Sequence, residues 1–244
     1  MKTVQFLSNS PQIDKITKGL TLTRSLFVSS LLMGEKHTGK KTFIKMLFPN
    51  AIYVDASQEQ ELILALEQYD KLIIYNFEKV QYIEKLNFEH KRIIAIANTT
   101  KNQQKFNSHF AFIYKMPSLQ EREELKLLID YFTKEIKEKL MIEVSTPITK
   151  ESLDLSHNIK SLKASISKQL ILQTLNKEEI EERLYQYLFQ EIEGNNAYRE
   201  HLGLYERPLI EAGLQKYKSQ LKLAGVLGLN RNTLRKKIQE YDIS

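Results

Sequence analysis

The segment from Gly34 to Thr42 carries residue types that suit the binding of phosphate groups. It reads Gly-Glu-Lys-His-Thr-Gly-Lys-Lys-Thr, follows an apolar run and precedes residues 43–47, which have the pattern of a helix. Glycines let backbone amides wrap around phosphates, and Lys40 can reach the terminal ones. Lys41 stands where a serine or threonine usually binds magnesium, so that hydroxyl is missing or displaced to Thr42. We expect a phosphate-binding loop, with a glycine-rich turn that has no ligand as the alternative.

A second group of residues, near the C-terminal end, suits a polyanionic partner. Residues 214–237 hold seven basic side chains and no acidic one, whereas the whole chain has a net charge of +6. A solvated helix face normally mixes both signs, so this concentration of one sign favours a phosphate-backbone partner. The basic residues are Lys216, Lys218, Lys222, Arg231, Arg235, Lys236 and Lys237.

The segment 220–238 predicts two short helices joined by a tight turn. Ala224 is small where the two helices must approach each other closely. Gly228 can adopt the left-handed conformation that ends the first helix. Asn230 can cap the second helix, because its side chain can accept a hydrogen bond from the amide of Asn232 or Thr233. The pattern is that of a helix-turn-helix.

The second helix of this pattern has an apolar inner face and a polar outer face. Leu234 and Ile238 face inward at i and i+4. The outer face can then lie in a DNA major groove, where Arg reads guanine and Asn reads adenine. Lysines flanking it are placed to hold phosphates. We predict that the DNA-binding residues are Lys218, Gln220, Lys222, Asn230, Arg231, Asn232, Thr233, Arg235, Lys236 and Lys237.

Apolar runs that alternate with helix-like segments up to about Met116 are expected to position the phosphate-binding loop. This alternation favours an open parallel sheet covered on both faces. Residues 117–175 have a helical pattern with a break at Thr146–Pro147. The expected strands are Ser25–Met33, Ala51–Val54, Lys71–Tyr75, Arg92–Ala97 and Phe110–Tyr114.

A third, helical part begins at Asn176. Asn176 and Glu179 have the spacing of a helix N-terminal capping box. From there one apolar stripe follows a helix, and Gly194 lies where that helix ends. The stripe consists of Ile180, Leu184, Leu188 and Ile192.

The segments Glu206–Ala212 and Leu229–Tyr241 closely resemble the DNA-binding domain of the Fis family, which also ends the NtrC-type activators. The resemblance extends upstream to about Ile180 and implies a homodimer through residues of about 180–216. Lys218-Ser219 departs from the family's usual Gly-Asn, and Lys222 from its common Arg, without a loss of charge. By this resemblance, the dimer core would consist of Leu184, Tyr187, Leu188, Leu209 and Ile210.

The N-terminal part resembles the AAA+ ATPase domain of NtrC-type activators. Residues 6–11, the loop, residues 91–98 and residues 116–122 occur in the order seen there, and that family's loop itself ends in Glu instead of Ser or Thr. The resemblance implies an α/β class, with a reduced AAA+-like parallel sheet and a helical lid followed by an all-α Fis-type helix-turn-helix domain. The implied domains are residues 1–116, 117–175 and 176–244, without the family's receiver domain.

The resemblance also assigns a nucleotide site. Asn98 falls on the sensor position, and Lys160 stands in a lid motif where the family has Arg. The implied ligand is ATP or ADP with magnesium, or no ligand at all. The implied nucleotide-binding residues are Gly34, Glu35, Lys36, His37, Thr38, Gly39, Lys40, Lys41, Thr42, Asn98 and Lys160.

Departures from the family predict a catalytically poor site, and we assign no catalytic residue. Asn76 and Phe77 replace the Asp-Glu pair that holds magnesium and activates water, and Glu78 comes one place late. A neutral amide is a weaker ligand for a hard cation than a carboxylate. No arginine occurs between Arg92 and Arg122, so the expected arginine fingers are missing, at a cost of about 10³ or more in phosphoryl transfer. The loop that contacts the nitrogen sigma factor (RpoN) is also missing.

Three interpretations of this domain stay open: a scaffold with an empty site, a nucleotide-binding domain without turnover, and a slow ATPase. For the whole chain we predict a DNA-binding transcriptional regulator. It would act as a homodimer or higher oligomer without RpoN-activating ATPase activity, and a nucleoid-organising role is a variant of this hypothesis. RNA polymerase or another regulator is a candidate partner. The alternative is a nucleotide-dependent ATPase that remodels a protein partner at DNA.

Composition excludes several other classes. The chain has no cysteine, which excludes disulfides, Cys-bound zinc and a catalytic thiol. Its five histidines lack a metal-ligand spacing, so we predict no metal site beyond a nucleotide's magnesium. No apolar run approaches the ~20 residues needed to span a bilayer, and the first residues do not resemble a secretory signal. We therefore expect no membrane partner and a cytoplasmic, nucleoid-associated protein.

Overall fold

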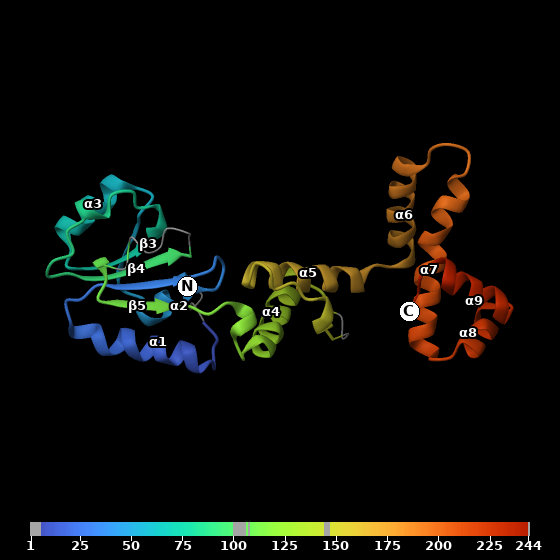
Figure 1. The fold of residues 1–244 in the computed structure, drawn as a ribbon, viewed down its shortest axis with the longest axis horizontal. Coiled ribbons are helices and arrows are strands. Elements are labelled where there is room, and N and C mark those ends of the chain that lie inside the picture. The colour runs from blue at the N-terminus through green and yellow to red at the C-terminus, as the bar shows by residue number, and fades with distance from the viewer. Residues whose placement is uncertain (1–5, 100–105, 107, 144–146, 244) are drawn as a thin grey trace. The chain divides into compact units, whose positions relative to one another are not determined.

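The computed structural model describes residues 6–99, 106, 108–143 and 147–243 (Figure 1). The chain divides into two compact units, residues 1–174 and 175–244. The sequence predicts a break in the helical pattern at Thr146–Pro147, and Thr146 lies outside the described residues.

The N-terminal unit is built on a parallel sheet. Within the described residues it has five strands in the order β2-β3-β4-β1-β5, and every pair is parallel. The parallel α/β class predicted from the sequence is therefore confirmed. The strands are β1 (Ser30–Gly34), β2 (Ile52–Asp55), β3 (Lys71–Tyr75), β4 (Arg92–Asn98) and β5 (Phe112–Lys115).

The predicted start of the first strand is wrong. The sequence predicts a strand from Ser25, but Thr23–Ser25 forms a 3-10 turn and β1 begins only at Ser30. Leu26 and Phe27 are 49% and 56% exposed, so their hydrophobicity does not reflect a place in the sheet.

Alternate residues of the buried strands supply two hydrophobic cores, one on each face of the sheet. Leu32 of β1 packs with α1 (Pro11–Leu22) and α2 (Lys40–Leu47). Leu31 packs on the other face with α3 (Glu59–Gln68). Figure 1 shows α1 and α3 on opposite sides of the sheet.

A small helical lid follows the sheet within the same unit. Its helices α4 (Leu125–Leu140) and α5 (Ile159–Thr174) share a core that includes Phe132 and Ile166. Short 3-10 turns connect the elements of the unit. They are η1 (Thr23–Ser25), η2 (Phe77–Lys79), η3 (Ile83–Lys85), η5 (Leu119–Glu121) and η6 (Lys150–Ser152).

The C-terminal unit is helical, with α6 (Lys177–Glu191), α7 (Ala197–Tyr217), α8 (Gln220–Leu227) and α9 (Arg231–Glu240). The capping box predicted at its start is confirmed, because Asn176 accepts from the amide of Glu179 at 2.8 Å and the Glu179 carboxylate accepts from the amide of Asn176 at 2.9 Å. The core of the unit holds Leu223 and Leu234 together with Ile210, which is 2% exposed. The resemblance assigns Ile210 to the dimer core, but the structure buries it in the core that α7 shares with α8 and α9.

Candidate functional sites

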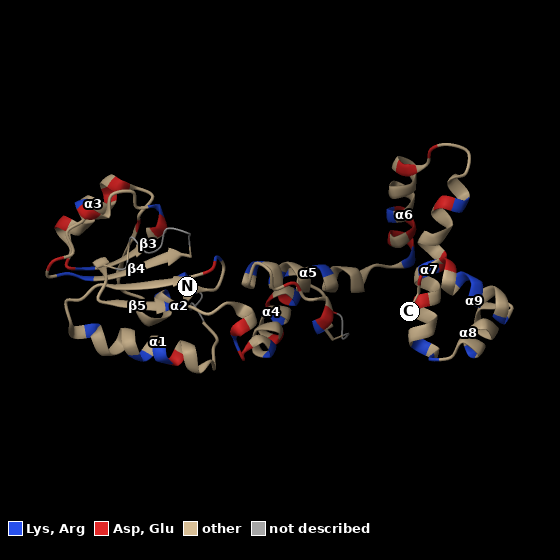
Figure 2. Cartoon of the chain, viewed as in Figure 1, with Lys and Arg blue, Asp and Glu red and all other residues tan. Residues whose placement is uncertain are grey.

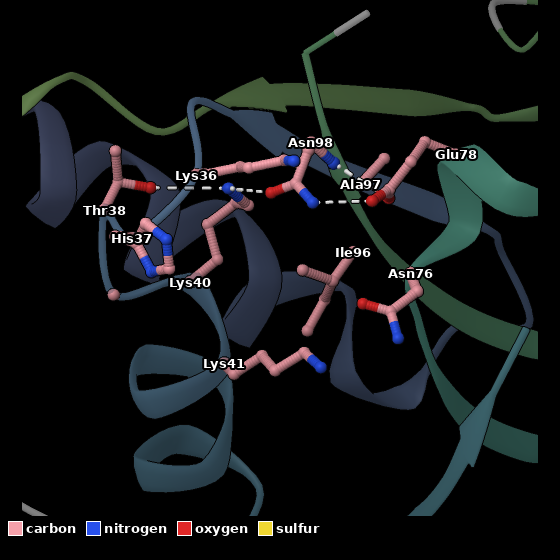
Figure 3. A pocket seen from close by; sticks show the side chains of 11 residues that line it. Lys36, His37, Thr38, Lys40, Lys41, Asn76, Glu78, Ile96, Ala97 and Asn98 are labelled. Carbon is pink, nitrogen blue, oxygen red and sulfur yellow. Dashed lines mark hydrogen bonds between the residues drawn. The ribbon is translucent and has the colours of Figure 1, made fainter. Parts of the chain in front are cut away.

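The phosphate-binding loop lies at one edge of the sheet. Because the strands are parallel, the carboxyl ends of β1, β3 and β4 meet there, which is where open α/β sheets bind their ligands. The loop runs from Gly34 at the end of β1 to Lys40 at the start of α2. The loop borders a cavity with a volume of ≈ 340 Å³ (Figure 3). It is lined by Lys36, His37, Thr38, Gly39, Lys40, Lys41, Asn76, Glu78, Ile96, Ala97 and Asn98.

Lys40 is held inside the loop that carries it. Its side chain is 6% exposed in the fold, and Nζ donates to the carbonyl oxygens of Gly34 at 2.9 Å and Glu35 at 2.5 Å. Nζ also donates to Oδ1 of Asn98 at 3.2 Å. Burial lowers the pKa of Lys40 to about 8, although the nearby carboxylate of Glu78 opposes this shift. The loop thus presents a partly desolvated cation at the bottom of the cavity.

Glu78 is a site residue that the sequence analysis did not assign. Its carboxylate accepts from the Asn98 side-chain amide at 2.5 Å and from the Asn98 backbone amide at 3.0 Å. Figure 3 shows the resulting chain of contacts from Thr38 through Lys40 and Asn98 to Glu78. One turn of 3-10 helix after β3 is what brings this carboxylate next to β4.

Asn76 is hydrogen-bonded to the carboxylate of Asp55 on the neighbouring strand β2. It has a left-handed backbone, with φ 51°, and its Nδ2 donates to both oxygens of Asp55 at 2.9 and 2.8 Å. Burial would raise the pKa of Asp55, but hydrogen bonds from Ser57 and Asn76 and the charge of Lys41 outweigh it and lower the pKa to about 2. Asp55 is therefore an ionised partner of Asn76 that the sequence analysis missed.

The lid is joined to the loop by buried polar contacts. Asn158, 2% exposed, accepts from the backbone amide of Leu119 at 2.7 Å and donates to the Glu35 carboxylate at 2.9 Å. Arg122, 5% exposed, donates to the carbonyl oxygen of Thr38 at 2.6 Å. These contacts fix the position of the loop relative to the lid.

Four predicted nucleotide-binding residues do not line the cavity, namely Gly34, Glu35, Thr42 and Lys160. Thr42 faces a neighbouring cavity of ≈ 190 Å³ between the loop and the lid. Lys160 is exposed at the start of α5. Burial, followed by the charge of Lys160, lowers the pKa of His37, so Lys160 is close to the loop although outside the cavity.

We expect Asn158→Ala to lower the free energy of unfolding of the N-terminal unit by about 1–3 kcal/mol, because it leaves the buried Leu119 amide without an acceptor. Urea unfolding of the full chain measures this loss. Asn158→Gly is the matched control for backbone strain, since Asn158 has φ 54° and glycine adopts that conformation freely. A loss with alanine but none with glycine would show that strain, and not the amide contact, is responsible.

The helix-turn-helix is defined by caps that the sequence predicts. Gly228 ends α8 in a left-handed conformation, with φ 65°, and the Asn230 side chain accepts from the amide of Asn232 at 2.8 Å at the start of α9. Both capping predictions are confirmed. Lys218 ends α7 with φ 53°, a conformation that glycine adopts more easily.

The outer face of α9 is free of contacts that would bury it. Its polar residues Arg231, Asn232, Thr233, Arg235 and Lys236 are all exposed, while Leu234 is fully buried beneath them. Figure 2 shows Lys and Arg positions recurring along this helix. The other predicted DNA-binding residues that are exposed are Lys218, Gln220, Lys222 and Asn230.

Lys237 differs from the prediction, which assigned it to a phosphate. Its Nζ donates to the Glu206 carboxylate at 2.5 and 2.7 Å, and the Tyr241 hydroxyl donates to the same carboxylate at 2.6 Å. Hydrogen bonds from Lys237 and then from Tyr241 keep the pKa of Glu206 below its usual value. Lys237 therefore fastens α9 to α7, and its charge is already paired.

An apolar groove lies between α6 and α7, with a volume of ≈ 440 Å³. Leu184, Leu188 and Ile192 of the predicted stripe line it together with Tyr198 and Tyr205. Leu184 is 38% exposed and Ile192 57% exposed, so the stripe is not covered within the C-terminal unit.

Among the His, Asp and Glu side chains that the structure describes, no group of three or more is arranged to hold a metal ion. Among the helices in the described part of the chain, none combines the length and the hydrophobicity needed to cross a membrane.

Comparison with known proteins identifies the C-terminal unit. Residues 195–244 match a family model described as a helix-turn-helix domain. The chain is 40% identical over 75 residues, 29% of its length, to a putative Fis-like DNA-binding protein of Pseudomonas aeruginosa, of which it covers 70%. It is 52% identical over 50 residues, 20% of its length, to the DNA-binding transcriptional regulator NtrC of Azospirillum brasilense, of which it spans only 10%.

Solved structures show the same fold over nearly the whole chain. NtrX from Brucella abortus in complex with ATP aligns with a TM-score of 0.53 at 13% identity, covering 98% of this chain and 69% of NtrX. The complex of NtrX with ADP aligns with a TM-score of 0.52 at 14% identity, covering 99% and 70%.

A parallel α/β unit with the fold seen in NtrX, followed by capped helices with an exposed basic face, defines a chain with a Fis-type helix-turn-helix domain. Through that domain the chain belongs to the Fis-like family of DNA-binding proteins. The fold class and the family relationship predicted from the sequence are thereby confirmed.

Proposed function

We propose that the protein is a transcriptional regulator that binds DNA as a homodimer and does not activate RpoN polymerase by ATP hydrolysis. The exposed face of α9 carries this proposal. Arg231, Asn232 and Arg235 are exposed on this face, within residues 214–237, which hold no acidic residue. Such a face suits base edges in the major groove, and Lys218, Lys222 and Lys236 suit the adjacent phosphates.

Homodimer formation would bring two such faces together. The uncovered stripe and groove between α6 and α7 support it, because exposed contiguous apolar surface usually marks an interface. A dimer of helix-turn-helix domains places its recognition helices one helical turn of DNA apart.

The N-terminal unit would bind a nucleotide without turning it over and so tune DNA affinity. A cavity lined by Lys36, Lys40 and Lys41 supports binding. The fold is shared with NtrX, which has been crystallised with ATP and with ADP. Asn76 in place of a carboxylate, together with the lack of any arginine between Arg92 and Arg122, argues against efficient hydrolysis.

The test is binding of the full chain to a labelled mixture of its own genomic DNA fragments at about 50 and 200 mM salt, with and without ATP. We expect retention of a few fragments and a steep loss of affinity at the higher salt. Even retention of all fragments would indicate a nucleoid-organising protein instead of a sequence-specific regulator. No retention at low salt would exclude the proposed function.

A phosphate-release assay decides between this function and an ATPase that remodels a partner at DNA. The cavity around Lys40 is the feature that keeps the second function open. We expect equal background rates for the wild-type chain and Lys40→Ala over multiple turnovers. A wild-type rate well above that of the variant would favour the ATPase.

A further inference from the structure

Two positions that hold magnesium in phosphate-loop proteins carry unsuitable side chains here. These positions are the residue after the loop lysine, a serine or threonine in most such loops and a Glu in NtrC-type activators, and a carboxylate at the end of a neighbouring strand. In this chain they are Lys41 and Asn76. An ammonium group repels a metal ion, and an amide supplies no charge to hold one. The residues present therefore do not fit magnesium.

The carboxylates nearest to these positions are already used inside the protein. Glu78 accepts two hydrogen bonds from Asn98, and both oxygens of Asp55 accept from Asn76. One of the Asp55 oxygens also accepts from the amide and hydroxyl of Ser57. Binding a metal ion through these groups would require breaking contacts that now hold β2, β3 and β4 together at this edge of the sheet.

Lysine side chains line the cavity where side chains that bind magnesium would be needed. Lys36, Lys40 and Lys41 all line the cavity, from the loop and the first turn of α2. The ammonium of Lys41 lies 4.5 Å from the centroid of the Tyr75 ring, at the end of β3. Figure 3 shows the Lys41 side chain extending from α2 toward Asn76, with Lys40 and Thr38 above it in the view.

Lys40 gives a second indication that the cavity suits an anion. It is 6% exposed, and its partners are carbonyl and side-chain oxygens that carry no charge. Burial without a directly bonded carboxylate lowers its pKa to about 8. A phosphate group next to Nζ would restore the charge balance of this buried ammonium.

We propose that the cavity binds the phosphate chain of a nucleoside polyphosphate without magnesium, with the ammonium of Lys41 taking the place of the ion. This inference rests on the proposed nucleotide binding and deepens it. Magnesium then competes with the lysines for the same phosphate oxygens, so the ion weakens binding where it usually strengthens it.

The test is the melting temperature of the full chain with ATP in EDTA, with ATP in excess magnesium, and with inorganic tripolyphosphate in EDTA. We expect ATP in EDTA to raise the melting temperature by about 5 °C at about 100 times its dissociation constant, and magnesium to reduce this shift. A shift with tripolyphosphate equal to that with ATP shows that the phosphate chain alone is recognised. A smaller shift shows that the nucleoside contributes as well.

Lys41→Thr introduces the hydroxyl found in most phosphate-binding loops and removes the proposed substitute for the ion. We expect metal-free ATP affinity, measured by isothermal titration calorimetry, to fall by about tenfold or more, as for loss of one charge-assisted hydrogen bond. Lys45→Thr is the matched control, because Lys45 lies one turn further along α2, also over a tyrosine ring, and outside the cavity. We expect the control to bind ATP as the wild type does.

Lys41→Thr combined with Asn76→Asp should make binding depend on magnesium. If the wild-type chain binds ATP only with magnesium, the inference is overturned while nucleotide binding stands. If ATP causes no shift in any condition, nucleotide binding itself is wrong, and the DNA-binding measurement remains as a separate test of the regulator.

Discussion

The double variant Arg231→Ala/Arg235→Ala is expected to lose its preference for the selected DNA fragments over random DNA. Both side chains are exposed on α9, one turn apart, above the buried Leu234. Each arginine that reads a guanine in the major groove contributes about 1–3 kcal/mol of discrimination, so the two together are worth a factor of about 10² or more. The measurement is fluorescence anisotropy of labelled fragments at fixed salt.

Lys15→Ala/Lys18→Ala is the matched control, because it removes the same charge from exposed positions on α1, outside the C-terminal unit. We expect the control to retain its preference. Lys222→Ala should instead weaken binding to specific and random DNA alike, as for a contact to phosphate. An equal loss on both kinds of DNA in the double arginine variant would contradict the assignment of these side chains to base edges.

The second large effect is expected from Leu184→Glu in the apolar groove. Leu184 lines the groove with Leu188 and Ile192 and is 38% exposed in the single chain. A carboxylate there would be buried without a partner in a dimer, at a cost that typically exceeds several kcal/mol. We expect the molecular mass in sedimentation equilibrium to fall from that of a dimer to that of a monomer.

DNA affinity should fall with the dimer, by about 10² or more, because the two half-sites would no longer be bound by one linked molecule. The helices should remain folded, since Leu184 is not part of the core around Leu223 and Leu234. Gln190→Glu places the same carboxylate on an exposed position of α6 outside the groove and should leave the mass unchanged. A monomeric wild-type chain would remove the dimer from the proposed function.

Features that depend on neighbouring residues in the chain could be predicted from the sequence. The caps at Gly228 and Asn230 and the capping box at Asn176 each involve groups within a few residues of one another. The strands could be placed because buried parallel strands are continuous apolar runs. That rule failed between Ser25 and Ser29, where apolar side chains are exposed and only the fold distinguishes them from strand residues.

Contacts between distant segments could not be predicted. Glu78 lies 20 residues from Asn98, Asp55 lies 21 from Asn76, and Glu206 lies 31 from Lys237. Each pair depends on which strands or helices become neighbours, and nothing in the spacing of the residues reveals that. The same reason explains Ile210, whose apolar character fits a dimer core and a domain core equally well.

The strand order also determines when the N-terminal unit can form during synthesis of the chain. The neighbours of β1 are β4 and β5, so Leu31 pairs with Ala95 and with Ile113. Both partners emerge from the ribosome long after β1, which must remain unpaired until residues 92–98 have been made. In the C-terminal unit α8 packs on α7 and α9 packs on α8, each on the helix made just before it. The N-terminal unit therefore cannot complete its sheet until distant segments have been synthesised, whereas the C-terminal unit can fold as it emerges.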